Sequence, residues 1–245
     1  MPLTQDLRAI YHLAFAPIRG ANHAERLESF YRGQADHYDR TRARLLHGRA
    51  EMIRALPIPT NGVWVDFGGG TGANLEHLGP RLAELRHVYI VDLAESLLAI
   101  AQRRIRDRGW TNVTALRADA TTFTPPEGSI DLATFSYSLT MIPNWFVALD
   151  HAHALLRPGG ILGVADFYVS RKHVPQGWRR HGWWTRTFWP TWFACDNVHL
   201  SPDHVPYLHH HFRAEHFVEG RGRLPWLPLV TVPYYWFVGV KQTAT

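Results

Sequence analysis

The feature that most constrains this chain is a glycine cluster at the end of a short apolar segment. Residues 63–67 form an apolar run rich in valine, and this run leads into Gly68, Gly70 and Gly72. Because glycine has no Cβ atom, its backbone can turn tightly and approach a ligand closely. A strand, such a loop and then a helix form the ligand-binding unit of many α/β proteins. The sequence therefore predicts a ligand site at the end of a first strand.

Further short apolar runs follow, with helical patterns or Gly and Pro residues between them. The five predicted strands cover residues 63–67, 88–91, 113–116, 130–135 and 160–165. Strands that alternate with helices form a parallel sheet, and ligands bind at the carboxyl ends of its strands. The expected fold class is α/β, a Rossmann-like, doubly wound and mostly parallel sheet with helices on both faces.

The outer parts of the chain depart from this alternation. We expect a single domain in which 1–56 forms N-terminal helices and a lid, with a helix over 34–55, and 57–167 forms the cofactor-binding core. Residues 168–212 are predicted to be an insertion after the fifth strand, rich in aromatic residues and histidine. Residues 213–245 then supply closing strands near 216–218 and 229–240.

Acidic residues follow the first three predicted strands. Asp66 precedes the glycine loop, and Asp92 and Asp119 follow the next two strands. A carboxylate at Asp66 would repel a dinucleotide pyrophosphate but suits a ligand that carries a cationic group. Asp92 is placed to accept hydrogen bonds from ribose hydroxyls. Each acid could instead cap its own loop, and a nicotinamide-dependent reductase is the competing interpretation of the glycine pattern.

The pattern D-x-G-x-G-x-G at 66–72, with the later acids and L-R-P-G-G at 156–160, resembles the class I S-adenosylmethionine-dependent methyltransferases. The resemblance implies S-adenosylmethionine as the cofactor, with Asp119 beside the adenine amino group. The predicted cofactor-binding residues are Tyr31, Arg49, Asp66, Gly68, Gly70, Gly72, Asp92, Leu93, Asp119, Ala120 and Ser136. Tyr31 is included because a lid tyrosine can cover a sulfonium by a cation–π contact, although the lid could equally be a helix that packs its tyrosines on the sheet.

A second resemblance concerns the substrate. The lid, residues 66–76 and the segment F-A-C-D-N-V-H-L at 193–200 resemble the betaine-lipid branch of this class. This resemblance implies a diacylglyceryl-homoserine N-methyltransferase that adds three methyl groups to a lipid amine at a membrane surface. It also implies an upstream aminocarboxypropyl transferase that supplies the lipid substrate. The alternatives are a phosphatidylethanolamine N-methyltransferase, an O- or C-methyltransferase of a quinone or other small molecule, and a non-catalytic S-adenosylmethionine-binding regulator.

An amine acceptor must lose a proton before it is methylated, so the site needs a proton acceptor. By location, the catalytic candidates are Tyr38 in the lid, Tyr137 after the fourth strand and His199 in the insertion. The candidates for holding the substrate are Asp166, Asp196, His209 and His211. We expect no metal, because adjacent histidines at 209–211 diverge and no second ligand cluster has suitable spacing.

The composition bears on where the protein acts. Ten Trp, a net charge of +5 and the mixture of Trp and Arg over residues 177–193 are typical of a membrane interface. An aromatic cap over the active site is the competing interpretation, and stacking on single-stranded nucleic acid is a third. We expect no nucleic-acid partner, because the N-P-P-Y or D-P-P-Y motif of base-amino methyltransferases does not occur. The single cysteine and the lack of a secretory signal favour a cytoplasmic protein, which we expect to associate peripherally with the membrane. The sequence does not predict an oligomeric state.

Overall fold

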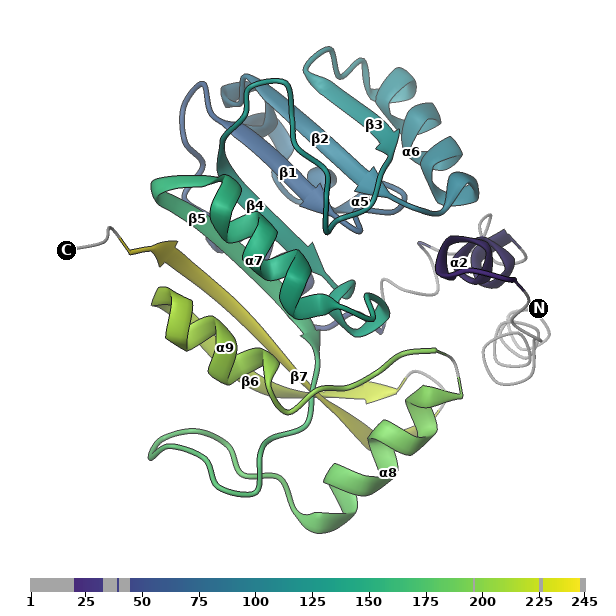
Figure 1. Cartoon of the computed structure of the whole chain (residues 1–245), viewed down its shortest axis with the longest axis vertical. Coiled ribbons are helices and arrows are strands. Elements are labelled where there is room, and N and C mark those ends of the chain that lie inside the picture. The colour runs from purple at the N-terminus through teal and green to yellow at the C-terminus, as the bar shows by residue number, and fades with distance from the viewer. Residues whose placement is uncertain (1–19, 33–38, 40–44, 196, 225–226, 243–245) are drawn as a thin grey trace.

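The computed structural model describes residues 20–32, 39, 45–195, 197–224 and 227–242. The strands are β1 (Val63–Phe67), β2 (His87–Asp92), β3 (Val113–Arg117), β4 (Ile130–Ser136), β5 (Leu156–Phe167), β6 (Phe212–Leu224) and β7 (Leu227–Lys241). In the described part of the chain they form one sheet in the order β3-β2-β1-β4-β5-β7-β6 (Figure 1). β1 to β5 pair in parallel, whereas β7 is antiparallel to both of its neighbours. The predicted α/β fold class is therefore confirmed.

Helices cover both faces of the sheet (Figure 1). They are α2 (His23–Arg32), α4 (Arg49–Ala55), α5 (Ala73–Glu76), α6 (Glu95–Arg108), α7 (Trp145–Leu155), α8 (Trp183–Ala194) and α9 (His204–His211), with short 3-10 segments η2 (Gly79–Glu84) and η3 (Leu139–Met141). Successive side chains of a strand point to opposite faces. Accordingly, Val65 of β1 belongs to an apolar cluster that also contains residues of α7 and α9, whereas Trp64 belongs to one that contains residues of α4, α5 and α6.

The strand order reverses beside β1, because β2 lies on one side of it and β4 on the other. Neighbouring loops leave the sheet in opposite directions at such a switch point, so a crevice opens at the carboxyl ends of the strands. The glycine loop follows β1 at this point. The topology therefore places the site where the sequence pattern predicts it.

Two sequence expectations differ from the structure in extent. The helix predicted over 34–55 lies partly outside the described residues, and within them α4 begins only at Arg49, after Gly48 in the left-handed region at φ 75°. The closing strands are longer than predicted, because β6 and β7 pair with each other from Phe212–Lys241 to Leu224–Leu227. A long hairpin of this kind extends both strands beyond the apolar segments that mark them in the sequence.

The predicted insertion contains two helices that pack in different places. α9 joins the apolar cluster under α7, through Val205 and Leu208. α8 joins another cluster, which also contains Leu27 and Tyr31 of α2. The insertion and the N-terminal helix therefore meet in one apolar cluster.

Candidate active site

A cleft opens at the carboxyl ends of β1, β2 and β4. It is closed on one side by α2, which contributes His23, Leu27 and Tyr31. The predicted cofactor residues that line it are Tyr31, Gly68, Gly70, Asp92, Leu93, Asp119, Ala120 and Ser136. The sheet thus brings together residues from the carboxyl ends of β1, β2, β3 and β4, and their role in binding the cofactor stays a prediction.

The glycine loop needs glycine at its turn positions. Gly68, Gly70 and Gly72 have φ angles of 66°, 55° and 69°, in the left-handed region that residues other than glycine rarely adopt. A Cβ atom on Gly68 would lie 2.4 Å from the Cβ of Ser138. A Cβ on Gly72 would lie 2.8 Å from Cδ1 of Ile90, so Gly72 packs against β2 and does not line the cleft.

Asp92 holds the turn that follows β2. Its two carboxylate oxygens accept hydrogen bonds from the backbone N–H groups of Gly70 (2.9 Å) and Ala94 (2.8 Å). Burial raises the pKa of Asp92 above its ordinary value, while these donors act in the opposite direction. The carboxylate lies on the cleft lining with lone pairs left over, as the predicted contact with ribose hydroxyls requires.

Two further polar groups lie on the lining. Asp119 is exposed, and its Oδ1 accepts hydrogen bonds from the N–H and hydroxyl of Thr121 at 2.8 and 2.7 Å. Ser136, at the end of β4, is buried, and its hydroxyl has no hydrogen-bond partner among the described residues. A buried hydroxyl without a partner is costly unless a ligand or water satisfies it. Ser136 is therefore available for a ligand.

Asp66 does not lie on the cleft lining. Its carboxylate is fully buried behind the glycine loop, where it accepts hydrogen bonds from Asn74 Nδ2 (2.9 Å) and Thr134 Oγ1 (2.6 Å). Burial raises the pKa of Asp66 to about 6. Arg49, at the start of α4, is also absent from the lining, and its charge partly offsets that rise in the pKa of Asp66. In this geometry Asp66 supports the loop from behind instead of facing a cationic group across the cleft.

The catalytic candidates are placed unequally. Tyr137 lines the cleft, but its hydroxyl donates a hydrogen bond to the carbonyl oxygen of His47 (2.5 Å), and burial raises the pKa of Tyr137 well above its ordinary value. A tyrosine held in this way is a poor proton acceptor near neutral pH. His199 is exposed and off the lining, with its backbone N–H bonded to the carbonyl of Thr140 (2.7 Å). Tyr38 lies outside the described residues.

The substrate candidates do not gather at the cleft. Asp166 is fully buried, accepts hydrogen bonds from the Thr140 hydroxyl (2.8 Å) and the Phe167 N–H (2.8 Å), and has a pKa raised by burial to about 7. It joins η3 to β5. His209 lines a separate cavity beside Trp178, and the ring of His211 lies against that of Tyr207. Both histidines are on α9, which packs against β6, the strand at the end of the sheet away from β1. Asp196 lies outside the described residues.

Sequence reasoning missed that α2 lines the cleft with His23 and Leu27. A signal for this helix exists in N-H-A-E at 22–25, which is a capping box. Asn22 Oδ1 accepts the N–H of Glu25 at 2.9 Å, and α2 begins at His23. Burial lowers the pKa of His23, so its imidazole is neutral near pH 7.

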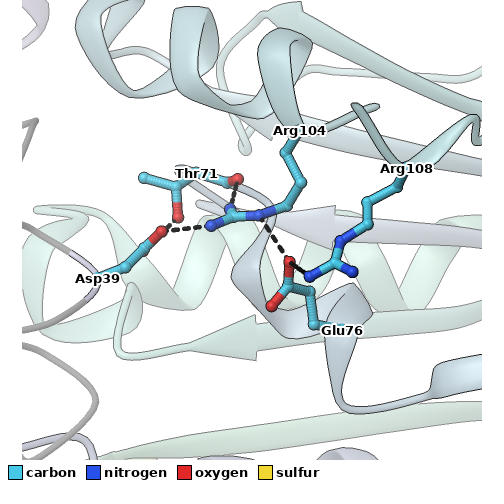
Figure 2. Close-up of polar contacts among 5 residues, drawn as sticks. All are labelled: Asp39, Thr71, Glu76, Arg104 and Arg108. Atoms are coloured by element: carbon cyan, nitrogen blue, oxygen red, sulfur yellow. Dashed lines mark hydrogen bonds and ion pairs between the residues drawn. The ribbon is translucent and has the colours of Figure 1, made fainter. Parts of the chain in front are cut away.

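A polar network ties the N-terminal segment to the glycine loop (Figure 2). Arg104 of α6 bonds to the carbonyl of Thr71 and to the carboxylate of Asp39, and its Nε lies 3.1 Å from Glu76. The Thr71 hydroxyl donates to Asp39 at 2.6 Å, and Arg108 also reaches Glu76 at 3.1 Å. One guanidinium therefore joins three segments that are far apart in the sequence.

Residues 36–217 match the methyltransferase domain family, most of the length of the chain. The chain belongs to this family. The demethylmenaquinone methyltransferase of Geobacillus stearothermophilus is 27% identical over 146 residues, 56% of this chain and 61% of that protein. The ubiquinone/menaquinone biosynthesis C-methyltransferase UbiE of Teredinibacter turnerae is 26% identical over 162 residues, 64% and 65% of the two chains. The chain spans less than two thirds of the length of these two relatives.

A solved structure shares the fold of this methyltransferase. The 1,6-didemethyltoxoflavin-N1-methyltransferase of Burkholderia thailandensis, with bound 1,6-didemethyltoxoflavin and S-adenosylhomocysteine, has a TM-score of 0.59 and 19% identity, covering 89% of this chain and 88% of that chain. The cofactor of this methyltransferase is S-adenosylmethionine. The cleft fits it, since Asp92 can hold ribose hydroxyls and the backbone of Gly68 and Gly70 lies on the cleft lining without side chains in the way. The nicotinamide interpretation is set aside.

Two further observations limit what the described part of the chain contains. None of its helices is both long enough and apolar enough to cross a bilayer. Its His, Cys, Asp and Glu side chains do not gather in threes in a way that would hold a metal ion.

Proposed function

We propose that this methyltransferase transfers a methyl group to a ring carbon of an apolar, quinol-type acceptor at a membrane surface. The observation that carries the proposal is the character of the cleft beyond β4. There the lining includes Tyr137, Met141, Ile142 and Pro143, and its polar members are Ser136, Ser138 and Asn144. These groups suit an apolar ring that carries a hydroxyl.

The named relatives support the same acceptor class. Both are quinone-pathway methyltransferases by name, and one is named a C-methyltransferase. The identity is 26–27% over part of each protein, so the names of these relatives support a proposal about the substrate.

The chemistry requires positioning and the removal of a proton. When bound, the cofactor supplies an electrophilic methyl group on a cationic sulfur. A ring carbon beside a hydroxyl becomes a better nucleophile as the hydroxyl proton leaves. We propose that Met141 and Ile142 orient the ring and exclude water, and that Ser136 holds a ring oxygen. His23, neutral because burial lowers its pKa, is a candidate for receiving the proton in place of Tyr137.

An amine acceptor is the competing assignment. It rests on the resemblance of residues 193–200 and of the lid to the betaine-lipid branch, and it would bring an aminocarboxypropyl transferase as the upstream partner. A zwitterionic headgroup needs an opposite charge for its amine. Of the two carboxylates predicted to hold the substrate, Asp166 is buried and bonded to Thr140 and Phe167, and Asp196 lies outside the described residues. This geometry gives an amine less support than a ring.

The test supplies three acceptors, each separately, to the same enzyme. Purified protein is incubated with labelled S-adenosylmethionine and, separately, a reduced demethylated quinol, diacylglyceryl-homoserine or phosphatidylethanolamine, and mass spectrometry locates the methyl group. We expect label on a ring carbon of the quinol. Label on the nitrogen of either lipid would replace the quinol proposal with the corresponding N-methyltransferase. Cofactor binding with no labelled acceptor would favour the non-catalytic regulator.

A further inference from the structure

α8 has two opposite faces of large aromatic side chains. Trp189 and Phe193, one helical turn apart, are buried in the cluster shared with α2. Trp184, Phe188 and Trp192 follow one another at intervals of four and are 75%, 45% and 48% exposed. Residues four apart lie on one side of a helix, so these three form a stripe pointing away from the protein core.

The inner face of α8 connects to the candidate active site through a series of aromatic rings in contact. The ring of Phe193 lies 4.9 Å from that of Phe167, and Phe167 lies 4.7 Å from Tyr137, which lines the cleft. α8 itself lies at one end of the molecule (Figure 1). A surface that engages the outer face of α8 would therefore be held close to the cleft.

The segment around α8 is strongly basic. Residues 168–195 contain five basic side chains and no acidic one, namely Arg171, Lys172, Arg179, Arg180 and Arg186. Arg171 pairs with Asp203 at 2.6 Å, whereas none of the other four has an ion pair with another described residue. The loop that leads into α8 thus carries positive charge, at Arg179 and Arg180, without an ion pair to another described residue, whereas the Nε of Arg186, on α8 itself, is buried.

We propose that the outer face of α8, formed by Trp184, Phe188 and Trp192, docks onto an anionic lipid bilayer. Tryptophan rings are stable at the depth of the lipid headgroups, and nearby Lys and Arg side chains are attracted to an anionic surface. Arg179 and Arg180, in the loop just before α8, supply such positive charge. The docking rests on the proposed function only in that the acceptor is then drawn from the same membrane.

A second copy of the chain fits this face less well. In a two-fold dimer the same surface meets itself, so the positive charge of Arg179 and Arg180 would be present on both sides of the interface. Like charges repel, and acidic residues to separate them are absent from 168–195. Anionic lipid phosphates supply the opposite charge that a second copy lacks.

The test compares vesicle binding by three proteins. Wild type, the triple variant Trp184→Ser, Phe188→Ser, Trp192→Ser and the control Val218→Ser are sedimented with vesicles of phosphatidylcholine, with and without phosphatidylglycerol. Val218 is a similarly exposed apolar residue, 40% exposed, on β6. We expect phosphatidylglycerol to strengthen binding of wild type and control, and the triple variant to bind at least roughly tenfold more weakly, which equals about 1.4 kcal/mol.

Several outcomes would overturn the docking proposal. One is equal vesicle binding by wild type and triple variant, and another is vesicle binding that phosphatidylglycerol does not change. A third is a wild-type protein that does not bind vesicles and is a dimer in analytical ultracentrifugation, whereas the triple variant is a monomer. The triple variant retains the buried Trp189 and Phe193, so we expect it to fold. Circular dichroism and S-adenosylmethionine binding check that it does.

A second readout separates this proposal from the proposed function. The triple variant should methylate a water-soluble, short-chain quinol as fast as wild type, and methylate a long-chain quinol in anionic vesicles more slowly. If no quinol is methylated but vesicle binding follows the expected order, the quinol assignment fails and the docking surface stands. If both quinols are methylated equally fast by the two proteins, the docking surface has no role in substrate access and the proposal fails.

Discussion

Gly68 occupies a position where two physical constraints coincide. Its φ of 66° disfavours any side chain, and a Cβ atom there would lie 2.4 Å from Ser138. Gly159, on β5, shares only the first constraint, because its φ is 77° and a Cβ atom would meet nothing within 4 Å. The two glycines therefore allow the cost of the conformation to be separated from the cost of the close approach.

We predict that Gly159→Ala lowers the free energy of unfolding by about 1 kcal/mol and leaves cofactor affinity unchanged, because only the backbone conformation is disfavoured. Gly68→Ala should in addition displace the loop and raise the dissociation constant of S-adenosylmethionine by roughly tenfold or more. Urea unfolding and isothermal titration calorimetry measure the two effects. Equal cofactor affinities in the two variants would contradict the role assigned to the loop.

At the scale of elements, α6 links the glycine loop to the segment that follows α2 (Figure 2). The side chain of Arg104 is 15% exposed and binds Asp39, Thr71 and Glu76, whereas that of Arg108 is 58% exposed and binds Glu76. Exposed ion pairs contribute little, while a partly buried cation that satisfies several acceptors contributes more. Arg108 is thus a matched control for Arg104.

We predict that Arg104→Met lowers the free energy of unfolding by about 2 kcal/mol, because it leaves the Thr71 carbonyl and the Asp39 carboxylate without this donor. Arg108→Met should cost less than about 1 kcal/mol. Urea unfolding of both variants beside wild type provides the measurement. A larger loss for Arg108→Met than for Arg104→Met would show that the network does not join these elements.

At the scale of the whole molecule, β7 makes the closing hairpin part of the core. It pairs with β5 from Ile161–Val240 to Phe167–Tyr234, and its Tyr235 and Phe237 are fully buried in the cluster that holds β1 and β4. The last strand in sequence is therefore an interior strand of the sheet. The cofactor cleft and the closing strands should unfold together, as a single domain requires.

We predict that Phe237→Ala lowers the free energy of unfolding by about 3–5 kcal/mol, by leaving a cavity in this shared core. Unfolding followed by tryptophan fluorescence and by loss of cofactor binding should give one coincident transition in wild type and variant alike. Loss of the hairpin at a lower urea concentration than loss of the cleft would instead indicate two units.

The sequence alone determined the fold class and the position of the cofactor cleft. Alternating apolar runs and the spacing of Gly68, Gly70 and Asp92 are local patterns, and the geometry of parallel sheets turns them into a site at the strand ends. The start of α2 at N-H-A-E was equally readable, since a capping box is also local. Periodicity did not reveal the full length of β6 and β7, because pairing along a hairpin extends strands past their apolar segments.

Only the tertiary structure decided which of the remaining residues reach the cleft. Asp66 and Asp166 lie near the carboxyl ends of β1 and β5, but partners from distant segments, Thr134 and Thr140, hold their carboxylates inside the protein. The two faces of α8 were likewise not separable from composition, because Trp189 and Trp192 differ only in what packs against them. Burial and partner choice depend on contacts between segments far apart in the chain, and a one-dimensional pattern contains no record of those contacts.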